Sequence, residues 1–325
     1  MDTLARSLVL TAPQRLEWID QLLAGPAPGT VLVRTVAGAI SSGSEVPQYV
    51  GTPRGTQPPR YPRMTGYESL GVVEAIGADV ERLRVGDRVV AFYGHRTAAL
   101  VPEHKALRVP EGIADELALL AILTCDAAKG VRRAAPLPEE PVLVTGAGAV
   151  GLFTLFILKA YGVAAVDVVE PDERRHALAR ALGARAVLRP EAAAAATDAA
   201  DDYAAGFECS ARNDAFALLQ TRLAANGRLC VLSDGNNEPL TLTPAFHEKE
   251  LRIAGSTDGW DYQQHAAWYF DSLRRTPTPL AGVFQLEVAA EDLAATFERL
   301  ARREVTPVKV LVRYGSSQPG TVALA

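Results

Sequence analysis

The spacing of hydrophobic and polar positions changes once along this chain. Up to about residue 117, short apolar runs with β character alternate with turns, as in segments 30–40, 71–77 and 86–92. Runs of this kind, separated by glycine, proline and aspartate, predict a mainly β region. From about residue 118, beginning within DELALLAILTCDAAKGV, apolar residues recur at helical spacing. The pattern therefore predicts two regions of different architecture.

The second region alternates strands with helices. The strand PVLVTG precedes a helix over 149–162, and the alternation continues to a strand over 250–256. This order predicts a parallel sheet with helices on both faces. The alanine-rich segment 191–206 is interpreted as a helix or surface connection, and the end of the chain from 315 as a loosely held tail. Beyond about 256, the pattern predicts these elements in order: helix 261–275, strand 283–288, helix 291–304 and strand 307–314.

Composition narrows the class of protein. A chain of 325 residues with 48% hydrophobic content suits two domains. The net charge of −5 is spread over both signs without a basic stripe, which argues against nucleic-acid binding. No apolar run is long enough for a signal segment or a membrane span. Three cysteines without CxxC spacing favour a reduced, cytoplasmic compartment.

A glycine-rich motif follows the strand PVLV. Gly146, Gly148 and Gly151 form GxGxxG, and Ala149 and Val150 open the helix that follows. The first glycine permits a tight turn, the second lets the backbone approach a pyrophosphate, and the third lets helix and strand pack closely. The N–H groups at the start of the helix would bind the phosphates. The sequence therefore predicts a dinucleotide site.

Glu170 ends the next strand, 19 residues after Gly151. A carboxylate there accepts hydrogen bonds from the adenosine ribose and repels a 2′-phosphate, which favours NAD. Arg174 and Arg175 follow closely and would soften that repulsion, so NADP stays possible.

A longer pattern resembles the medium-chain dehydrogenase/reductase family. It comprises Gly66-Tyr67-Glu68, Gly71, Gly77 and Gly86-Asp87-Arg88-Val89, followed by the glycine motif. The resemblance implies an α/β protein in which a Rossmann dinucleotide-binding domain (118–255) interrupts a mainly β, GroES-like catalytic domain (1–117 and 256–325). It also implies an active site in the cleft between domains and a homodimer.

The zinc-using members of this family carry metal ligands that this chain lacks. The resemblance puts Ser42, Tyr67 and Ile122 at the three ligand positions, and residues 91–117 hold no cysteine for a second zinc. Catalytic zinc requires sulfur, nitrogen or carboxylate donors. We therefore expect an enzyme without zinc. The segments ISSGSE and GYES look most like a zinc-free branch that includes bacteriochlorophyllide 3-hydroxyethyl dehydrogenases.

Without a Lewis acid, another group must stabilise the charge that forms on oxygen. Tyr67 is the first candidate, because its hydroxyl donates a hydrogen bond and then a proton. Ser44 matches the position of a proton-relay hydroxyl. His95 matches a position where some zinc-free relatives carry a histidine that faces the cleft, and an imidazole suits proton transfer. Glu68 would orient Tyr67. The alternatives are a packed tyrosine, a turn-capping serine, a structural ion pair and a buried or surface histidine.

The resemblance implies three more cofactor contacts. Ser210 and Ser233 follow strands that end at the cofactor edge of the sheet. Lys309, in PVKV, matches a basic position near the cofactor phosphates, or is a surface lysine.

Together these features predict an NAD(P)-dependent oxidoreductase that acts on a small alcohol/ketone pair without zinc. Two alternatives remain open from the sequence. The first is a double-bond reductase of the same family, and the second is a dinucleotide-binding sensor without turnover.

Overall fold

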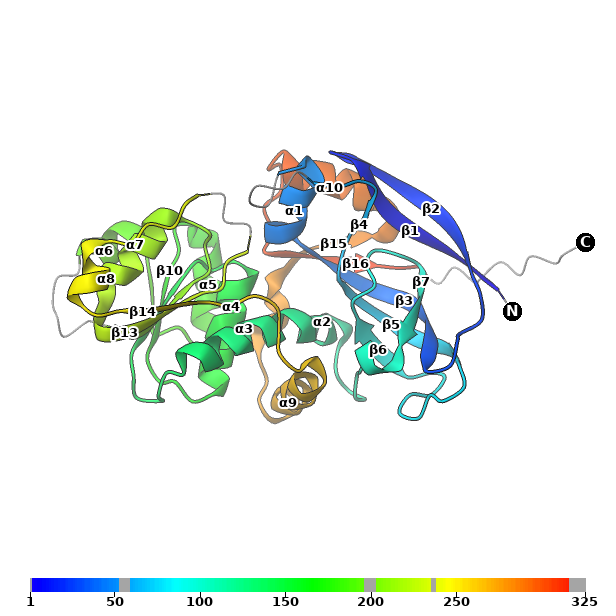
Figure 1. Ribbon diagram of the computed structural model, residues 1–325, viewed down its shortest axis with the longest axis horizontal. Helices are drawn as coiled ribbons and strands as arrows, with labels where there is room; N and C mark the ends of the chain where they lie inside the picture. Colours follow the sequence, from blue (N-terminus) through cyan, green and yellow to red (C-terminus); the bar gives the residue numbers. More distant parts are fainter. Residues whose placement is uncertain (1, 53–58, 196–202, 235–237, 316–325) are drawn as a thin grey trace, which may run out of the picture. The chain divides into compact units, whose positions relative to one another are not determined.

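The structure is a computed structural model that describes residues 2–52, 59–195, 203–234 and 238–315. The chain divides into two compact units (Figure 1). Unit 1 comprises Met1–Ala121, Gln263–Arg274 and Phe284–Ala325; unit 2 comprises Ile122–Tyr262 and Arg275–Val283. The domain borders expected at 117/118 and 255/256 remain a prediction. The tail from 316 onward lies outside the described residues.

Two sheets form most of unit 1. The smaller is antiparallel, with strand order β2-β1-β4. The larger has the order β15-β16-β3-β5-β6-β8, and β7 pairs with β3. The strands of unit 1 are β1 (Thr3–Ala12), β2 (Arg15–Leu23), β3 (Thr30–Ser41), β4 (Arg63–Met64), β5 (Glu68–Ile76), β6 (Arg88–Ala91), β7 (Ala98–Pro102), β8 (Leu107–Arg108), β15 (Phe284–Ala289) and β16 (Lys309–Arg313).

Strand β3 connects two hydrophobic cores. Its first half buries Val31 and Val33 in a cluster with Val73 and other residues of the neighbouring strands. Its second half buries Ile40 in a cluster that includes Phe297. Val31, Val33 and Ile40 are β-branched, which suits an extended chain packed on both sides. This strand ends at Ser41, where the candidate catalytic residues begin.

The helices that belong mainly to unit 1 are α1 (Ser42–Val50), α2 (Asp115–Leu119), α9 (Tyr262–Arg275) and α10 (Leu293–Ala301), with the 3₁₀ turns η1 (Glu103–Lys105) and η5 (Ala290–Asp292). The sequence pattern did not predict helix α1. Pro47 lies inside this helix and obscured it in the sequence pattern. The helix begins where the Glu45 carboxylate accepts the backbone N–H of Ser41 at 2.8 Å.

Unit 2 contains one six-stranded sheet, in which every neighbouring pair is parallel. Its strand order is β11-β10-β9-β12-β13-β14. The fold class predicted from strand and helix alternation is thereby confirmed. The strands are β9 (Val142–Thr145), β10 (Val166–Val169), β11 (Ala186–Leu188), β12 (Tyr203–Glu208), β13 (Leu223–Val231) and β14 (Arg252–Gly255).

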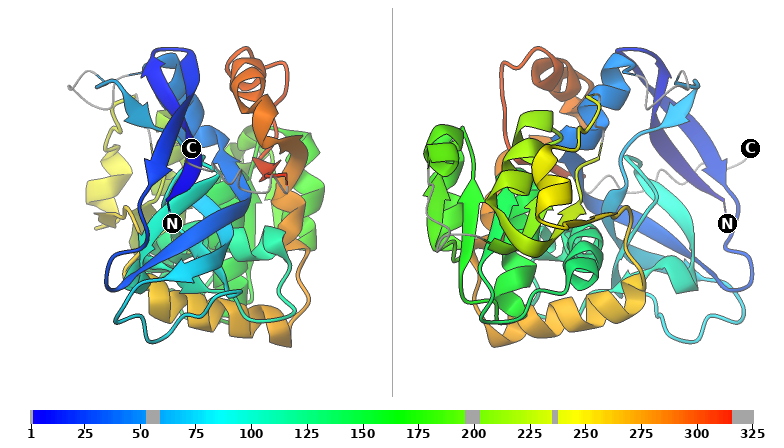
Figure 2. Two further views of the ribbon diagram at one scale, coloured as in Figure 1. Left: turned by 90° about the vertical axis from the view of Figure 1, so that its right-hand side faces the viewer. Right: turned by 60° about the vertical axis from the view of Figure 1, so that its left-hand side comes forward.

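Helices cover both faces of this sheet (Figure 2). The chain runs from β9 to β10 in one direction across the sheet and from β12 to β13 in the other. Right-handed crossovers therefore put α4 and α7 on opposite faces. The helices of unit 2 are α3 (Ala121–Ala134), α4 (Ala149–Ala160), α5 (His176–Ala181), α6 (Pro190–Ala195), α7 (Asn213–Arg222) and α8 (Pro244–Glu248), with 3₁₀ turns η2 (Glu173–Arg175) and η4 (Pro279–Val283).

One sequence interpretation in unit 2 was wrong in part. Residues 191–206 were taken for a helix or surface connection, but Tyr203–Gly206 lie within strand β12. Alanine at 204 and 205 gives no strand signal by itself. These residues become a strand because β9 and β13 bond to them on both sides.

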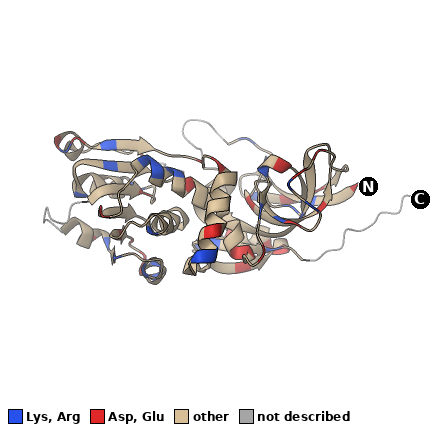
Figure 3. Cartoon of the chain, turned by 90° about the horizontal axis from the view of Figure 1, so that it is seen from below, with Lys and Arg blue, Asp and Glu red and all other residues tan. Residues whose placement is uncertain are grey.

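Charges of both signs are interspersed along both units (Figure 3), in agreement with the scattered pattern of the sequence. Within the part of the chain that the structure describes, we find no helix with the length and apolarity that a membrane crossing demands.

We expect Gly71→Ala to destabilise unit 1 by about 3 kcal/mol, because overpacking at a backbone contact forces strands apart. A Cβ atom at Gly71 would lie 2.4 Å from the Arg34 carbonyl oxygen of the paired strand. Urea denaturation measures the change. Gly25→Ala is the control, since no atom lies within 4 Å of its added methyl group. Equal stability of the two variants would contradict the packing described for β3 and β5.

Candidate functional site

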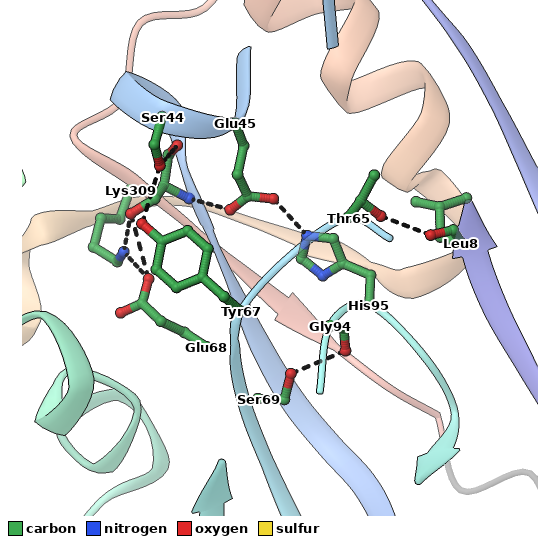
Figure 4. A network of polar contacts seen from close by, with 11 residues as sticks. Leu8, Ser44, Glu45, Thr65, Tyr67, Glu68, Ser69, Gly94, His95 and Lys309 are labelled. Atoms are coloured by element: carbon green, nitrogen blue, oxygen red, sulfur yellow. Dashed lines mark hydrogen bonds and ion pairs between the residues drawn. The ribbon is translucent and has the colours of Figure 1, made fainter. Parts of the chain in front are cut away.

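Two hydroxyl groups meet at the end of strand β3 in unit 1 (Figure 4). Tyr67 directly precedes β5, and Ser44 lies in the first turn of α1. Their oxygen atoms are 3.0 Å apart, and either hydroxyl could be the donor. The structure thus brings together two of the three residues for which proton handling was predicted, Tyr67 and Ser44.

A buried ion pair lies beside these hydroxyls. The Lys309 ammonium pairs with the Glu68 carboxylate and also donates to Ser41 Oγ at 2.9 Å. Glu68 is 1% exposed and Lys309 is 0% exposed. Lys309 is therefore not a surface lysine. Its predicted contact with cofactor phosphates remains a prediction, and the partners of its ammonium in this structure are Glu68 and Ser41.

This environment keeps Tyr67 protonated. Burial raises the pKa of its phenol well above 10, and the carboxylates of Glu68 and Glu45 raise it further. Hydrogen bonds from Ser41 and Ser44 oppose the shift without cancelling it. Burial also raises the pKa of Glu68, with the Lys309 charge acting in the opposite direction. Tyr67 is thus a hydrogen-bond donor over the whole neutral range.

His95 contacts Glu45. Its Nε2 atom lies 3.1 Å from the Glu45 carboxylate, whose other oxygen holds the N–H of Ser41. His95 is 1% exposed and Nδ1 has no partner among the described residues. The contact connects the imidazole to the start of α1, which carries Ser44. Direct proton transfer by His95 remains a prediction, because this geometry shows only the support of α1.

Gly66 lets the backbone before Tyr67 pass over the His95 ring. Its φ of +74° lies in the left-handed region, which favours glycine. A Cβ atom there would lie 2.8 Å from two ring carbons. The backbone of the turn that leads into Tyr67 therefore packs directly against the imidazole ring of His95.

The glycine motif forms a turn at the start of α4 in unit 2. Gly146 adopts a φ of +88°, and a Cβ atom at Gly151 would lie 1.8 Å from the Gly146 carbonyl oxygen. At Gly148, by contrast, an added Cβ would meet nothing within 4 Å. The turn is thus tightly closed on its inner side and open in front of the helix N-terminus, where Ala149 and Val150 begin α4.

Glu170 supports this turn. One of its carboxylate oxygens accepts the N–H of Ala147 at 2.6 Å, and the other accepts the N–H of Asp172 at 2.8 Å. Arg175 Nη1 lies 3.7 Å from the same carboxylate. The contact of Glu170 with a ribose remains a prediction, and the position of Glu170 directly after β10 agrees with it. The predicted effect of Arg175 on a 2′-phosphate is likewise untested; Arg175 lies in the 3₁₀ turn η2.

Ser210 and Ser233 share one partner that the sequence reasoning missed. Both hydroxyls donate to Glu208, which is 0% exposed at the end of β12. The sequence did offer a signal for Glu208, because an acidic residue at the end of an otherwise apolar strand is unusual. Glu45 and Ser41 were also missed, although Glu45 lies within the segment ISSGSE.

The residues of unit 2 fit a dinucleotide. The open space before Gly148 leaves room for a pyrophosphate, and α4 is long enough to offer a helix N-terminus with free N–H groups. The carboxyl ends of β9 and β12, where the strand order reverses, are the place where such sheets bind ligands.

The residues at the zinc-ligand positions do not fit that metal. Ser42 donates its hydroxyl to the Pro307 carbonyl at 3.5 Å, and Tyr67 bonds Ser44. Neutral hydroxyls are poor zinc ligands beside cysteine or histidine. Within the described ranges, no group of three His, Cys, Asp or Glu side chains could hold a metal ion.

Comparison with known proteins identifies the family. Residues 27–114 match the alcohol dehydrogenase GroES-like domain, and residues 149–270 match the zinc-binding dehydrogenase family. The chain is 31% identical over 271 residues to 2-desacetyl-2-hydroxyethyl bacteriochlorophyllide A dehydrogenase of Cereibacter sphaeroides, covering 76% of this chain and 80% of that protein. This chain belongs to the medium-chain dehydrogenase/reductase family. The family consists of NAD(P)-dependent oxidoreductases, and its GroES-like and Rossmann architecture is the one predicted.

Other relatives match over shorter stretches. The chain is 30% identical to starvation-sensing protein RspB of Escherichia coli, over 55% of this chain and 61% of that protein. L-idonate 5-dehydrogenase of Vitis vinifera is 24% identical over 60% of this chain and 64% of its own length. The chain therefore matches less than two thirds of both relatives.

Solved structures share the fold. An Escherichia coli RspB structure in complex with NADH has a TM-score of 0.81 at 22% identity and covers 96% of this chain and 99% of its own. The 2R,3R-butanediol dehydrogenase of Bacillus subtilis has a TM-score of 0.81 at 20% identity, over 95% and 99%.

We expect Lys309→Met to destabilise the protein by about 3–5 kcal/mol, because it leaves the Glu68 carboxylate buried without a counter-charge. The double variant with Glu68→Gln should regain much of this loss. Urea denaturation of both single variants and the double variant forms the test. Independent, additive losses would contradict a coupled pair.

The pH dependence of stability provides a second test of the Lys309→Met variant. Loss of Lys309 removes an interaction that lowers the pKa of Glu68, so the folded protein binds this proton still more tightly than the unfolded chain. An acid with a raised folded pKa loses its stabilising contribution as pH rises. The stability of Lys309→Met should therefore fall as pH rises above about 4.5, the ordinary value for glutamate.

Proposed function

We propose that this protein is a zinc-independent, NAD(P)-dependent dehydrogenase that interconverts a small alcohol and its ketone, with Tyr67 as the proton-handling group. The observation that carries the proposal is the Tyr67–Ser44 hydroxyl pair, 3.0 Å apart, beside the buried Glu68 and Lys309. A bound nicotinamide supplies or accepts the hydride at C4 of its ring.

The protonation state of Tyr67 supports a role as an acid. With its pKa raised well above 10, the hydroxyl holds its proton at neutral pH and can donate a hydrogen bond to a carbonyl oxygen. As the carbon is reduced, that oxygen becomes strongly basic and takes the proton. In the opposite direction, Tyr67 would have to lose its proton first, which its surroundings oppose. The arrangement therefore favours ketone reduction.

Ser44 can exchange its hydrogen-bond direction during such a step. Its hydroxyl lies 3.4 Å from the Ser41 carbonyl oxygen as well as 3.0 Å from Tyr67. When Ser44 donates to Ser41, Tyr67 donates to Ser44. When Ser44 turns to donate to Tyr67, the phenolic proton becomes available to a substrate. After the transfer, Ser44 also stabilises the phenolate that remains.

The names of the relatives favour an alcohol over an activated double bond. They include sorbitol dehydrogenase, L-threonine 3-dehydrogenase and the bacteriochlorophyllide dehydrogenase, each named as a dehydrogenase of a hydroxyl compound. Double-bond reduction and dinucleotide sensing without turnover remain the alternatives. The predicted homodimer and cytoplasmic location are kept as predictions.

NAD is the proposed cofactor, with NADP as the alternative. The Glu170 carboxylate at the end of β10 would repel a 2′-phosphate, whereas Arg175 lies close enough to reduce that repulsion. We propose a mechanism without zinc because Ser42 and Tyr67, at two of the family's zinc-ligand positions, offer only neutral hydroxyl groups, which are poor zinc ligands.

We expect Tyr67→Phe to lower kcat/KM for ketone reduction by about 10²- to 10⁴-fold, because the ring stays and only the proton donor is lost. Steady-state kinetics with NADH and a panel of ketones, enones and aldehydes measures this. Between pH 6 and about 10, the wild-type rate should lose nothing to tyrosine ionisation, since the pKa of Tyr67 lies above that range.

Tyr93→Phe is a matched control. Its buried hydroxyl bonds Thr35 at 3.2 Å, so the variant loses the same chemical group away from Ser44. Its kinetics should stay within about twofold of wild type, at a stability cost of about 1 kcal/mol. Full activity of Tyr67→Phe would refute the proposed role. Tight NADH binding without turnover of any panel compound would support a sensor instead.

Metal analysis tests the zinc-independent part of the proposal. We expect far less than one zinc per chain in protein purified without chelator, because the positions of the zinc ligands offer hydroxyl groups. Turnover should be the same before and after treatment with a strong chelator. One tightly bound zinc per chain, together with loss of activity on its removal, would show that the proposal is wrong.

A further inference from the structure

The Glu208 carboxylate accepts several hydrogen bonds at the end of strand β12. Oε1 accepts the Ser210 N–H at 2.7 Å and the Ser210 hydroxyl at 2.5 Å, while Oε2 accepts the Ser233 hydroxyl. The residue is 0% exposed, whereas both serines are half-buried. The fully buried carboxylate is thus bonded to two serines that are themselves only half-buried.

This cluster lies next to the glycine turn. Glu208 is opposite Thr145 of β9 and Val231 of β13 in the parallel sheet. Gly146 follows Thr145 directly, and a Cβ atom on Gly146 would lie 3.2 Å from Ser210 Cα. Strands β9 and β12 are also the pair at which the strand order reverses, so the two serines border the crevice where such sheets bind a ligand.

The carboxylate determines the direction in which the serines bond. An ionised carboxylate only accepts hydrogen bonds, and a serine hydroxyl has one hydrogen and two lone pairs. Ser210 and Ser233 therefore use their hydrogens on Glu208, and any ligand group that meets these two hydroxyls must donate to them. Phosphate oxygens accept and do not match such groups. Ribose hydroxyls and a carboxamide NH₂ donate and do match.

We propose that Glu208 is a positioning residue that makes Ser210 and Ser233 hydrogen-bond acceptors for the nicotinamide half of the dinucleotide, and not donors to its phosphates. The inference rests on the proposed function and names the part of the cofactor that these serines recognise. The phosphates are left to the N–H groups at the start of α4.

The test compares three ligands by isothermal titration calorimetry: ADP, ADP-ribose and NADH. Glu208→Gln keeps the size of the side chain but puts an NH₂ group on one serine, whose hydrogen must then turn toward the ligand. We expect about tenfold weaker NADH binding, the equivalent of one mismatched hydrogen bond, and ADP binding within about twofold of wild type. A loss already seen with ADP-ribose assigns the contact to the second ribose, and a loss with NADH alone assigns it to the carboxamide.

Two further variants separate recognition from folding. Ser210→Ala removes one acceptor from a half-buried position and should weaken NADH binding while sparing ADP. Asp167→Asn is the matched control, because this buried carboxylate on β10 bonds Arg185 and Tyr203 and lies opposite Leu143, two residues before the end of β9. It should lower stability without changing the ratio of NADH to ADP affinity.

The outcomes distinguish this inference from the proposed function. Equal losses for ADP and NADH in Glu208→Gln, or unchanged NADH binding in both Glu208→Gln and Ser210→Ala, would overturn the inference alone. Wild-type protein that binds none of the three ligands would contradict the proposed function and the inference together.

Discussion

A carboxylate removed from water must be surrounded by donors, and this constraint organises both units of the protein. Glu68 has Lys309 and Ser41, Glu45 has His95 and the N–H of Ser41, and Glu208 has two serines. An unsatisfied buried charge costs several kcal/mol, so each acid fixes the groups around it. The candidate catalytic and cofactor residues are therefore positioned by neighbouring acids that are buried from solvent.

The same acids determine what the hydroxyls in front can do. Beside Glu68 and Glu45, Tyr67 keeps its proton, so this residue can act as an acid without a metal. Beside Glu208, the hydrogens of both serine hydroxyls are directed at the carboxylate, so a ligand group that meets these hydroxyls must donate to them. Buried carboxylates thus act differently in the two units: in unit 1 they raise the pKa of Tyr67, and in unit 2 Glu208 sets the direction of two hydrogen bonds.

The sequence predicted the parts of the fold that depend on local pattern. Alternating strands and helices and the turn at Gly146 indicated a dinucleotide-binding sheet, because periodicity and glycine geometry are local properties. It missed helix α1, where Pro47 masked the pattern, and strand β12, whose alanines become extended through their neighbours. The pairing of Lys309 with Glu68 joins residues 241 positions apart, and no local signal reports such a contact.

The close approach of Gly151 to the Gly146 carbonyl has a consequence for how cofactor preference can evolve. No side chain fits between these two residues, so position 151 on the inner side of the turn requires glycine. In the proposed dinucleotide site, selection between the two nicotinamide cofactors would therefore act on the outer positions, where the side chains of Arg174 and Arg175 are 74% and 26% exposed. Such a site would combine an inner turn whose composition is fixed by sterics with outer positions whose side chains are free to vary.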